Sequence, residues 1–90
     1  MKIMFIIVVY DVQEKRVNRV LKTCRKYLTW VQNSVLEGEL EESSVRKLQI
    51  EIKNIIEEDE DSVLFYQFRT KQYFSREIIG LVKGSDKQFF

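Results

Sequence analysis

The 90-residue chain has no histidine, no proline and only one cysteine, Cys24. Because histidine is absent, a Ser-His-Asp triad, a histidine general base and a histidine-ligated metal site are excluded within this chain. A single cysteine can form neither an internal disulfide nor a cysteine-rich zinc site. We expect Cys24 to be a small buried hydrophobic residue. One cysteine also fits a protein of a reducing compartment. Catalysis would therefore use carboxylates, hydroxyls, lysines or a hard metal ion held by oxygen ligands.

The composition, with 44% hydrophobic and 32% charged residues and a net charge of +1, is typical of one small globular domain. Its main apolar run, residues 3–10, is too short to cross a bilayer and leads into charged residues without a small-residue cleavage site. We interpret this run as a central strand buried on both faces, and we expect a cytoplasmic protein without a membrane partner. Since so short a chain buries only a marginal core, a homodimer is a natural expectation.

Charge is distributed unevenly along the chain. Residues 1–36 contain seven Lys/Arg and two acids, and residues 37–61 contain three Lys/Arg and ten acids. Residues 62–90 contain five Lys/Arg and two acids. One face can therefore be strongly basic although the whole chain is nearly neutral.

Hydrophobic periodicity predicts alternating strands and helices. In order, the expected elements are a strand at 3–10, a helix at 14–28, a strand at 30–40, a helix at 45–56, a strand at 62–69 and a short strand at 78–82. Ser43 or Ser44 can cap the second helix. The strand at 30–40 is expected to bend or divide near Gly38, and Gly80 interrupts the last strand.

This order is typical of an α+β, ferredoxin-like βαββαβ sandwich, in which two helices cover one face of a sheet. The other face would carry aromatic residues from the last third of the chain, and a homodimer that packs sheet against sheet would cover them. We predict one ferredoxin-like domain at residues 1–80 and a C-terminal strand or tail at residues 81–90. That short extra strand would pair with the sheet edge of the partner subunit or contact another partner.

Asp11, which follows Tyr10 at the end of the first strand, is the main candidate for chemistry, since side chains at strand ends often gather into sites. A structural role is the alternative. Asp11 and Glu14 form a pattern close to a capping box at the start of the next helix. The two roles are compatible because a cap uses only one carboxylate oxygen.

The first helix carries six basic residues and no acid between them: Lys15, Arg16, Arg19, Lys22, Arg25 and Lys26. Like charges at i,i+3 and i,i+4 destabilise a helix, so an anion would relieve the repulsion. The basic face could be an ordinary solvated face, could be neutralised by the acidic second helix, or could bind a phosphate backbone.

A polar trio, Gln32, Asn33 and Ser34, lies within the strand predicted at residues 30–40. On strand alternation, Gln32 and Ser34 share one face and Asn33 lies on the other. We interpret these three residues as makers of cross-strand hydrogen bonds.

Four stretches, taken in order, resemble the smaller of the two core CRISPR adaptation proteins, called here the Cas-two family. They are VVYDV at 8–12, KRVNRVLK at 15–22, VQNSVLEG at 31–38 and DSVLFY at 61–66. The resemblance implies a ferredoxin-like homodimer in which the two Asp11 carboxylates face each other across the dimer axis and share a divalent metal. Leu36 departs from the family pattern, which has phenylalanine there, and Trp30 stands where relatives often have a basic residue.

The resemblance implies a metal-dependent endonuclease that cleaves RNA or DNA and works with the CRISPR integrase subunit in spacer acquisition. Asp11 would be the catalytic residue and the ligand of Mg²⁺ or Mn²⁺, supported by Tyr10 and Ser34. The basic helix would bind nucleic acid through Lys15, Arg16, Arg19 and Lys22. Two neighbouring carboxylates repel unless they share a proton or a cation, and oxygen ligands favour Mg²⁺ or Mn²⁺, which can activate water and polarise a phosphodiester.

A non-catalytic scaffold is the alternative function. In it, the homodimer would hold duplex DNA or single-stranded RNA by backbone contacts and bridge dimers of the integrase. A more distant alternative is a toxin-like ribonuclease of the same fold.

Overall fold

The computed structural model describes residues 2–69 and residue 79. The elements follow the expected βαββαβ order: β1 (Ile3–Asp11), α1 (Glu14–Arg25), β2 (Thr29–Gln32), β3 (Val35–Glu41), α2 (Glu42–Lys53) and β4 (Ser62–Phe68). Apart from Ile79, the last expected strand at 78–82 lies outside the described residues, as does the C-terminal segment 81–90. The division into residues 1–80 and 81–90 therefore stays a prediction. Within the described part of the chain, no helix is long and apolar enough to cross a membrane.

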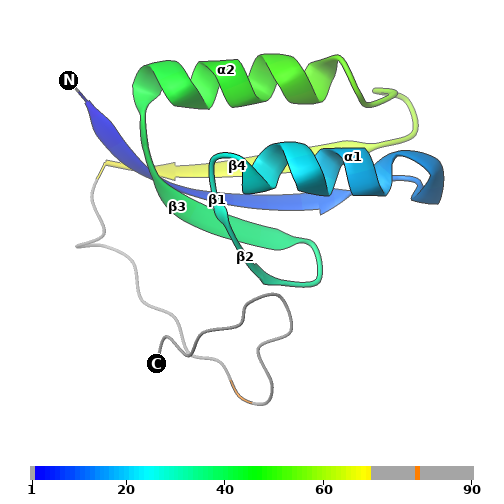
Figure 1. Cartoon of the computed structure of the whole chain (residues 1–90), viewed down its shortest axis with the longest axis horizontal. Helices are drawn as coiled ribbons and strands as arrows, with labels where there is room; N and C mark the ends of the chain where they lie inside the picture. Colours follow the sequence, from blue (N-terminus) through cyan, green and yellow to red (C-terminus); the bar gives the residue numbers. More distant parts are fainter. Residues whose placement is uncertain (1, 70–78, 80–90) are drawn as a thin grey trace.

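The four strands form one antiparallel sheet in the order β2-β3-β1-β4. Both helices lie on the same face of this sheet (Figure 1). β1 lies between β3 and β4, which explains why residues 3–10 are apolar on both faces. The arrangement confirms the α+β, ferredoxin-like sandwich.

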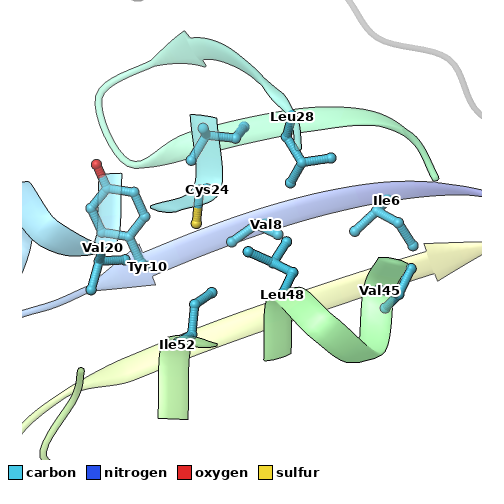
Figure 2. Close-up of a cluster of buried hydrophobic side chains, with 10 residues drawn as sticks. Ile6, Val8, Tyr10, Val20, Cys24, Leu28, Val45, Leu48 and Ile52 are labelled. Carbon is cyan, nitrogen blue, oxygen red and sulfur yellow. The ribbon is translucent and has the colours of Figure 1, made fainter. Parts of the chain in front are cut away.

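The hydrophobic core fills the space between the two helices and the sheet. Its most deeply buried side chains come from all of these layers: Ile6 and Val8 from β1, Val20 and Cys24 from α1, Leu36 from β3, and Leu48 and Ile52 from α2. Figure 2 shows the side chains from β1, α1 and α2 converging between the ribbons. Cys24 is completely buried, which confirms that this cysteine is a small buried hydrophobic residue. Its burial raises the pKa of the thiol to about 12.

The turn between β2 and β3 lies at Asn33 and Ser34 rather than near Gly38. Gln32 pairs with Val35 across this two-residue loop, and Asn33 has a φ of 44°, a left-handed conformation that asparagine tolerates well. The interpretation of the polar trio as strand residues is therefore wrong for Asn33 and Ser34 and confirmed for Gln32, which ends β2. Gly38 instead allows Leu28 to pack closely against β3, since a Cβ there would approach Leu28 Cδ2 to 3.1 Å.

The start of α2 also differs from the prediction. α2 begins at Glu42 directly after β3, so Ser43 and Ser44 lie in its first turn and neither serine caps it. The Glu42 N–H instead donates to the Lys2 carbonyl at 3.0 Å. A neighbouring chain segment thus satisfies a helix-terminal donor that the sequence pattern assigned to a serine.

Two residues of α2 provide a matched test of the core. Leu48 is completely buried, whereas Ile50 is 60% exposed. Leu48→Ala should lower the free energy of unfolding by about 2–5 kcal/mol, because it removes buried methyl groups and leaves a cavity. Urea unfolding monitored by circular dichroism measures this change.

Ile50→Ala is the control and should change the unfolding free energy by less than about 1 kcal/mol. Equal destabilisation by the two substitutions would contradict the assignment of Leu48 to the helix–sheet core.

Candidate functional site

Asp11 is the last residue of β1 and its side chain is exposed. Its Cα pairs with that of Ser62, the first residue of β4. Because strand side chains alternate, Asp11 and Val9 lie on the sheet face opposite α1 and α2, here called the far face. Asp11 therefore lies at one end of the far face and is open to a partner or a ligand.

The first helix does not use Asp11 as a cap. The N-cap residue of α1 is Gln13, whose own side chain makes no cap hydrogen bond. The capping-box prediction for Asp11 and Glu14 is therefore wrong. The carboxylate of Asp11 also makes no hydrogen bond or ion pair within residues 2–69, so both oxygens are available for chemistry.

Tyr10 and Ser34 lie at the same end of the sheet as Asp11, but their contacts are structural. The Tyr10 ring points into the core beneath the helices, on the opposite sheet face from Asp11 (Figure 2). Its N–H donates to the Ser34 carbonyl at 3.1 Å, and burial raises the pKa of its hydroxyl. The structure thus joins Tyr10 to the β2–β3 turn rather than bringing its hydroxyl to Asp11.

Arg16 and Asp61 form a buried ion pair beside this site. Arg16 Nε lies 2.6 Å from Asp61 Oδ2, and Arg16 Nη2 lies 3.0 Å from Asp61 Oδ1. The side chain of Asp61 is completely buried, and that of Arg16 is 11% exposed. This two-point contact joins α1 to the residue directly before β4.

The Asp61 carboxylate also binds two backbone groups. It accepts hydrogen bonds from the N–H of Gln13 and the N–H of Glu57, both at 2.9 Å. A second acid, Glu60, lies 2.8 Å from Arg16. Hydrogen bonds from Arg16, followed by those from the two backbone N–H groups, hold the pKa of Asp61 well below its usual range despite burial.

The buried position of Arg16 corrects its predicted role in nucleic-acid binding. Its guanidinium is engaged by Asp61 and Glu60, so it is not available to a phosphate. Sequence reasoning missed Asp61 because it ends a run of five acids that resembles a solvated turn. The one available signal was its position directly before the strand at residues 62–69.

Three other predicted basic residues are exposed on α1: Lys15, Arg19 and Lys22. Spacings of four and three residues place them on one side of the helix. None of them forms an ion pair within the described ranges, 2–69 and 79. We call these three residues the basic stripe, and they are free to bind an anion.

The acids of α2 neutralise α1 only near its end, since α2 contains just two acids, Glu42 and Glu51, beside three basic residues. Both Lys26 and the Tyr27 hydroxyl contact the carboxylate of Glu51 on α2. Hydrogen bonds from these two groups lower the pKa of Glu51. Internal neutralisation is therefore confirmed for Lys26, while the basic stripe remains without an acidic partner among the described side chains.

The far face is strongly apolar along β1 and β4. It carries Ile3, Phe5, Ile7 and Val9 from β1, and Leu64, Tyr66 and Phe68 from β4. Leu64 and Tyr66 are each 50% exposed. The β3 residues that pair with β1 on this face are Val35, Glu37, Glu39 and Glu41, so acids border most of one side of the apolar area.

A single copy of the chain supplies few ligands for a metal. No group of three His, Cys, Asp or Glu residues in the described part of the chain is placed to hold an ion. Asp11 offers oxygen ligands that suit Mg²⁺ or Mn²⁺, but only one carboxylate. One carboxylate suits a hard divalent ion in chemistry but makes a sparse site, which a second Asp11 from another copy would extend.

Comparison with known proteins adds independent information. The model of the family described as "CRISPR associated protein Cas2" matches residues 4–76. "CRISPR-associated endoribonuclease Cas2" of Dictyoglomus turgidum is 53% identical over 94% of this chain and 98% of that protein. The protein of the same name from Thermotoga maritima is 52% identical over 97% of this chain and all of that protein. A crystal structure of a Cas2 protein has 43% identity and a TM-score of 0.85, and the match covers 99% of this chain and 100% of that chain.

The ion pair between Arg16 and Asp61 makes a specific prediction about acid stability. Since the folded-state pKa of Asp61 lies below its ordinary value of 3.8, its stabilisation is fully present above that pH and is lost as the pH falls below it. Asp61→Asn should lower the melting temperature at neutral pH, because a buried guanidinium then lacks its main partner. The melting temperature of this variant should also fall less steeply than that of the wild type below pH 3.8.

Glu60→Gln is the matched control, because Glu60 is half exposed and its loss leaves the contact between Arg16 and Asp61 intact. Thermal unfolding followed by circular dichroism between pH 2 and pH 7 compares the three proteins. The ion pair would not have the stated role if Asp61→Asn and Glu60→Gln had equal effects.

Proposed function

This chain belongs to the Cas2 family of CRISPR associated proteins, as its sequence motifs indicated, and on that premise we propose that it is a metal-dependent endoribonuclease of CRISPR adaptation. The observation that carries the proposal is the exposed Asp11 carboxylate at the end of β1, free of any hydrogen bond or ion pair within residues 2–69. The names of the relatives support RNA as the substrate. The same proposal includes that this protein acts together with the CRISPR integrase in spacer acquisition.

The reactive site is proposed to form between two copies of the chain. Asp11 of each copy would contribute one carboxylate to a shared Mg²⁺ or Mn²⁺ ion. Such an ion, when bound, lowers the pKa of a bound water and polarises a phosphodiester. The part played by this chain is to hold the two carboxylates at a fixed place, because pairing with Ser62 fixes the end of β1.

The far face supplies the reason for a homodimer. It is an apolar surface formed by β1 and β4, in which Leu64 and Tyr66 are half exposed. Large exposed apolar patches on soluble domains usually mark interaction sites. A second copy is the fitting occupant because Asp11 lies at the end of the same face, so packing face against face about an axis near that end would bring two Asp11 residues toward each other.

The basic stripe is proposed to hold the sugar-phosphate backbone. Lys15, Arg19 and Lys22 are exposed and have no acidic partner in the described part of the chain. A homodimer would present six such cations, and phosphate contacts of this kind give affinity without reading sequence. Arg16 is left out of this role because Asp61 and Glu60 engage it.

A non-catalytic scaffold is the second candidate function, and one observation favours it. The basic stripe is on α1, above the sheet, whereas Asp11 is on the opposite face. A nucleic acid held by the stripe is therefore not held at the carboxylate of the same copy. In this function the homodimer would bind nucleic acid and integrase without cleaving.

Asp11→Asn separates these two functions. If the protein is an endonuclease, the substitution should abolish cleavage of single-stranded RNA in Mg²⁺ or Mn²⁺, because the amide is a poor metal ligand, and should leave binding of the RNA unchanged. Gel electrophoresis of labelled RNA measures cleavage, and fluorescence anisotropy in EDTA measures binding.

Asp59→Asn is the matched control, since Asp59 is an exposed acid in the loop before β4 and has no place in the proposed site. The endonuclease proposal fails if the wild-type protein binds RNA but cleaves neither RNA nor DNA with either metal. Such a result would support the scaffold.

The dimer has its own test on the far face. Leu64→Glu should convert a homodimer to a monomer, because it places a charge within an apolar interface. Sedimentation equilibrium measures the mass of both proteins. Ile50→Glu is the control, since Ile50 is 60% exposed on α2, away from the far face, and should leave the dimer intact. A Leu64→Glu protein that remains dimeric would place the interface elsewhere.

A further inference from the structure

An arginine–tryptophan pair lies where the end of α1 meets the edge strand β2. The Cζ atom of Arg25 is 5.5 Å from the centroid of the Trp30 ring. Arg25 is exposed, whereas Trp30 is half buried and packs against the core. The indole is therefore supported from within the protein, and the guanidinium covers it on the solvent side.

The indole is fixed in orientation by the hairpin turn that follows it. Trp30 Nε1 donates a hydrogen bond of 2.8 Å to the carbonyl of Asn33. Asn33 itself holds the left-handed conformation of the two-residue loop. A ring held in this way loses little conformational freedom when a ligand contacts it, so binding there costs less entropy.

Unlike its neighbour Lys26, Arg25 is available to bind a ligand. Lys26 also lies over an aromatic ring, that of Tyr27, at 5.9 Å. However, Glu51 engages both Lys26 and the Tyr27 hydroxyl. Arg25 has no acidic partner among residues 2–69, and its positive charge is therefore open to a ligand.

The pair lies at one end of the basic stripe. Lys22 precedes Arg25 by about one helical turn, and the helix from Lys15 to Arg25 rises about 15 Å. A strand of nucleic acid whose phosphates follow Lys15, Arg19 and Lys22 would therefore reach Arg25 with a later nucleotide. At Arg25 the basic surface of α1 meets the aromatic ring of Trp30.

We propose that Arg25 and Trp30 form a stacking site for one unpaired nucleobase of a single-stranded nucleic acid. The proposal rests on the proposed function in one respect, which is that the basic stripe binds the backbone. Guanidinium planes and aromatic rings are the surfaces on which proteins stack unpaired bases. Bases inside a duplex are already stacked on each other, so the site selects single strands over duplexes.

The chain has one tryptophan, so its fluorescence reports on this site alone. The experiment titrates the full-length protein with a short oligouridine, its DNA counterpart and a closed-ended duplex, all in EDTA so that no cleavage occurs. Anisotropy of a labelled strand measures binding in the same samples. Stacking should quench the Trp30 emission with single strands and leave it unchanged with duplex at equal occupancy.

Arg25→Ala keeps the fluorescent reporter and the core, and it should weaken single-strand binding by about fivefold or more. Arg46→Ala is the matched control, because Arg46 is an exposed arginine on α2 without an aromatic partner among the described residues. It should have a smaller effect. Trp30→Phe, which retains an aromatic ring, should bind more tightly than Trp30→Leu. An abasic strand of the same charge has no base to stack, so it should bind Arg25→Ala and Arg46→Ala with equal affinity.

The outcomes separate this inference from the proposed function. Unchanged Trp30 emission at saturating single strand, or equal effects of Arg25→Ala and Arg46→Ala, would overturn the stacking site. Loss of cleavage in Asp11→Asn would still stand in that case. A wild-type protein that binds neither single strands nor duplex would overturn both the stacking site and the role of the basic stripe.

Discussion

The contact between Arg16 and Asp61 connects two segments that are far apart in the sequence, residues 13–16 and residues 57–61. Asp61 binds the guanidinium of Arg16 on α1, the N–H of Gln13 before α1 and the N–H of Glu57 after α2. Burying a carboxylate completely costs free energy unless its lone pairs accept hydrogen bonds. Here each of the two Asp61 oxygens accepts two hydrogen bonds. The contact therefore fixes the short connection between β1 and α1 against the residue directly before β4.

The central position of β1 divides the molecule into two functional sides. Its helix-facing residues form the core, while its alternate residues join those of β4 in the apolar far face. Asp11 ends the second set, which places the candidate catalytic group on the side proposed for dimerisation. The basic stripe and Arg25 come from α1, above the sheet, and Trp30 comes from the edge strand β2. The proposed binding of nucleic acid and the proposed catalysis would therefore use different surfaces of the same copy.

Local pattern was sufficient for the elements but not for their junctions. The apolar spacing of residues 14–28 and 45–56 and the run at 3–10 gave the order, and with it the ferredoxin-like sandwich, because burial on one helical stripe or on two strand faces leaves a direct periodic signal. The turn at Asn33 and the start of α2 at Glu42 were predicted wrongly. Both depend on which backbone groups find partners elsewhere, such as the Lys2 carbonyl.

The sequence by itself determined which residue types are available for chemistry, because histidine is absent from the whole chain. It also determined the topology and the candidate carboxylate, because the periodic apolar pattern and the strand-to-helix junction at Asp11 are local properties. Only the tertiary structure decided the roles of similar charges. Arg16 and Arg19 belong to one basic run, yet Arg16 is buried against Asp61 while Arg19 is exposed. The physical reason is that an ion pair depends on distance between segments remote in sequence, here residues 16 and 61, and no periodicity records that distance.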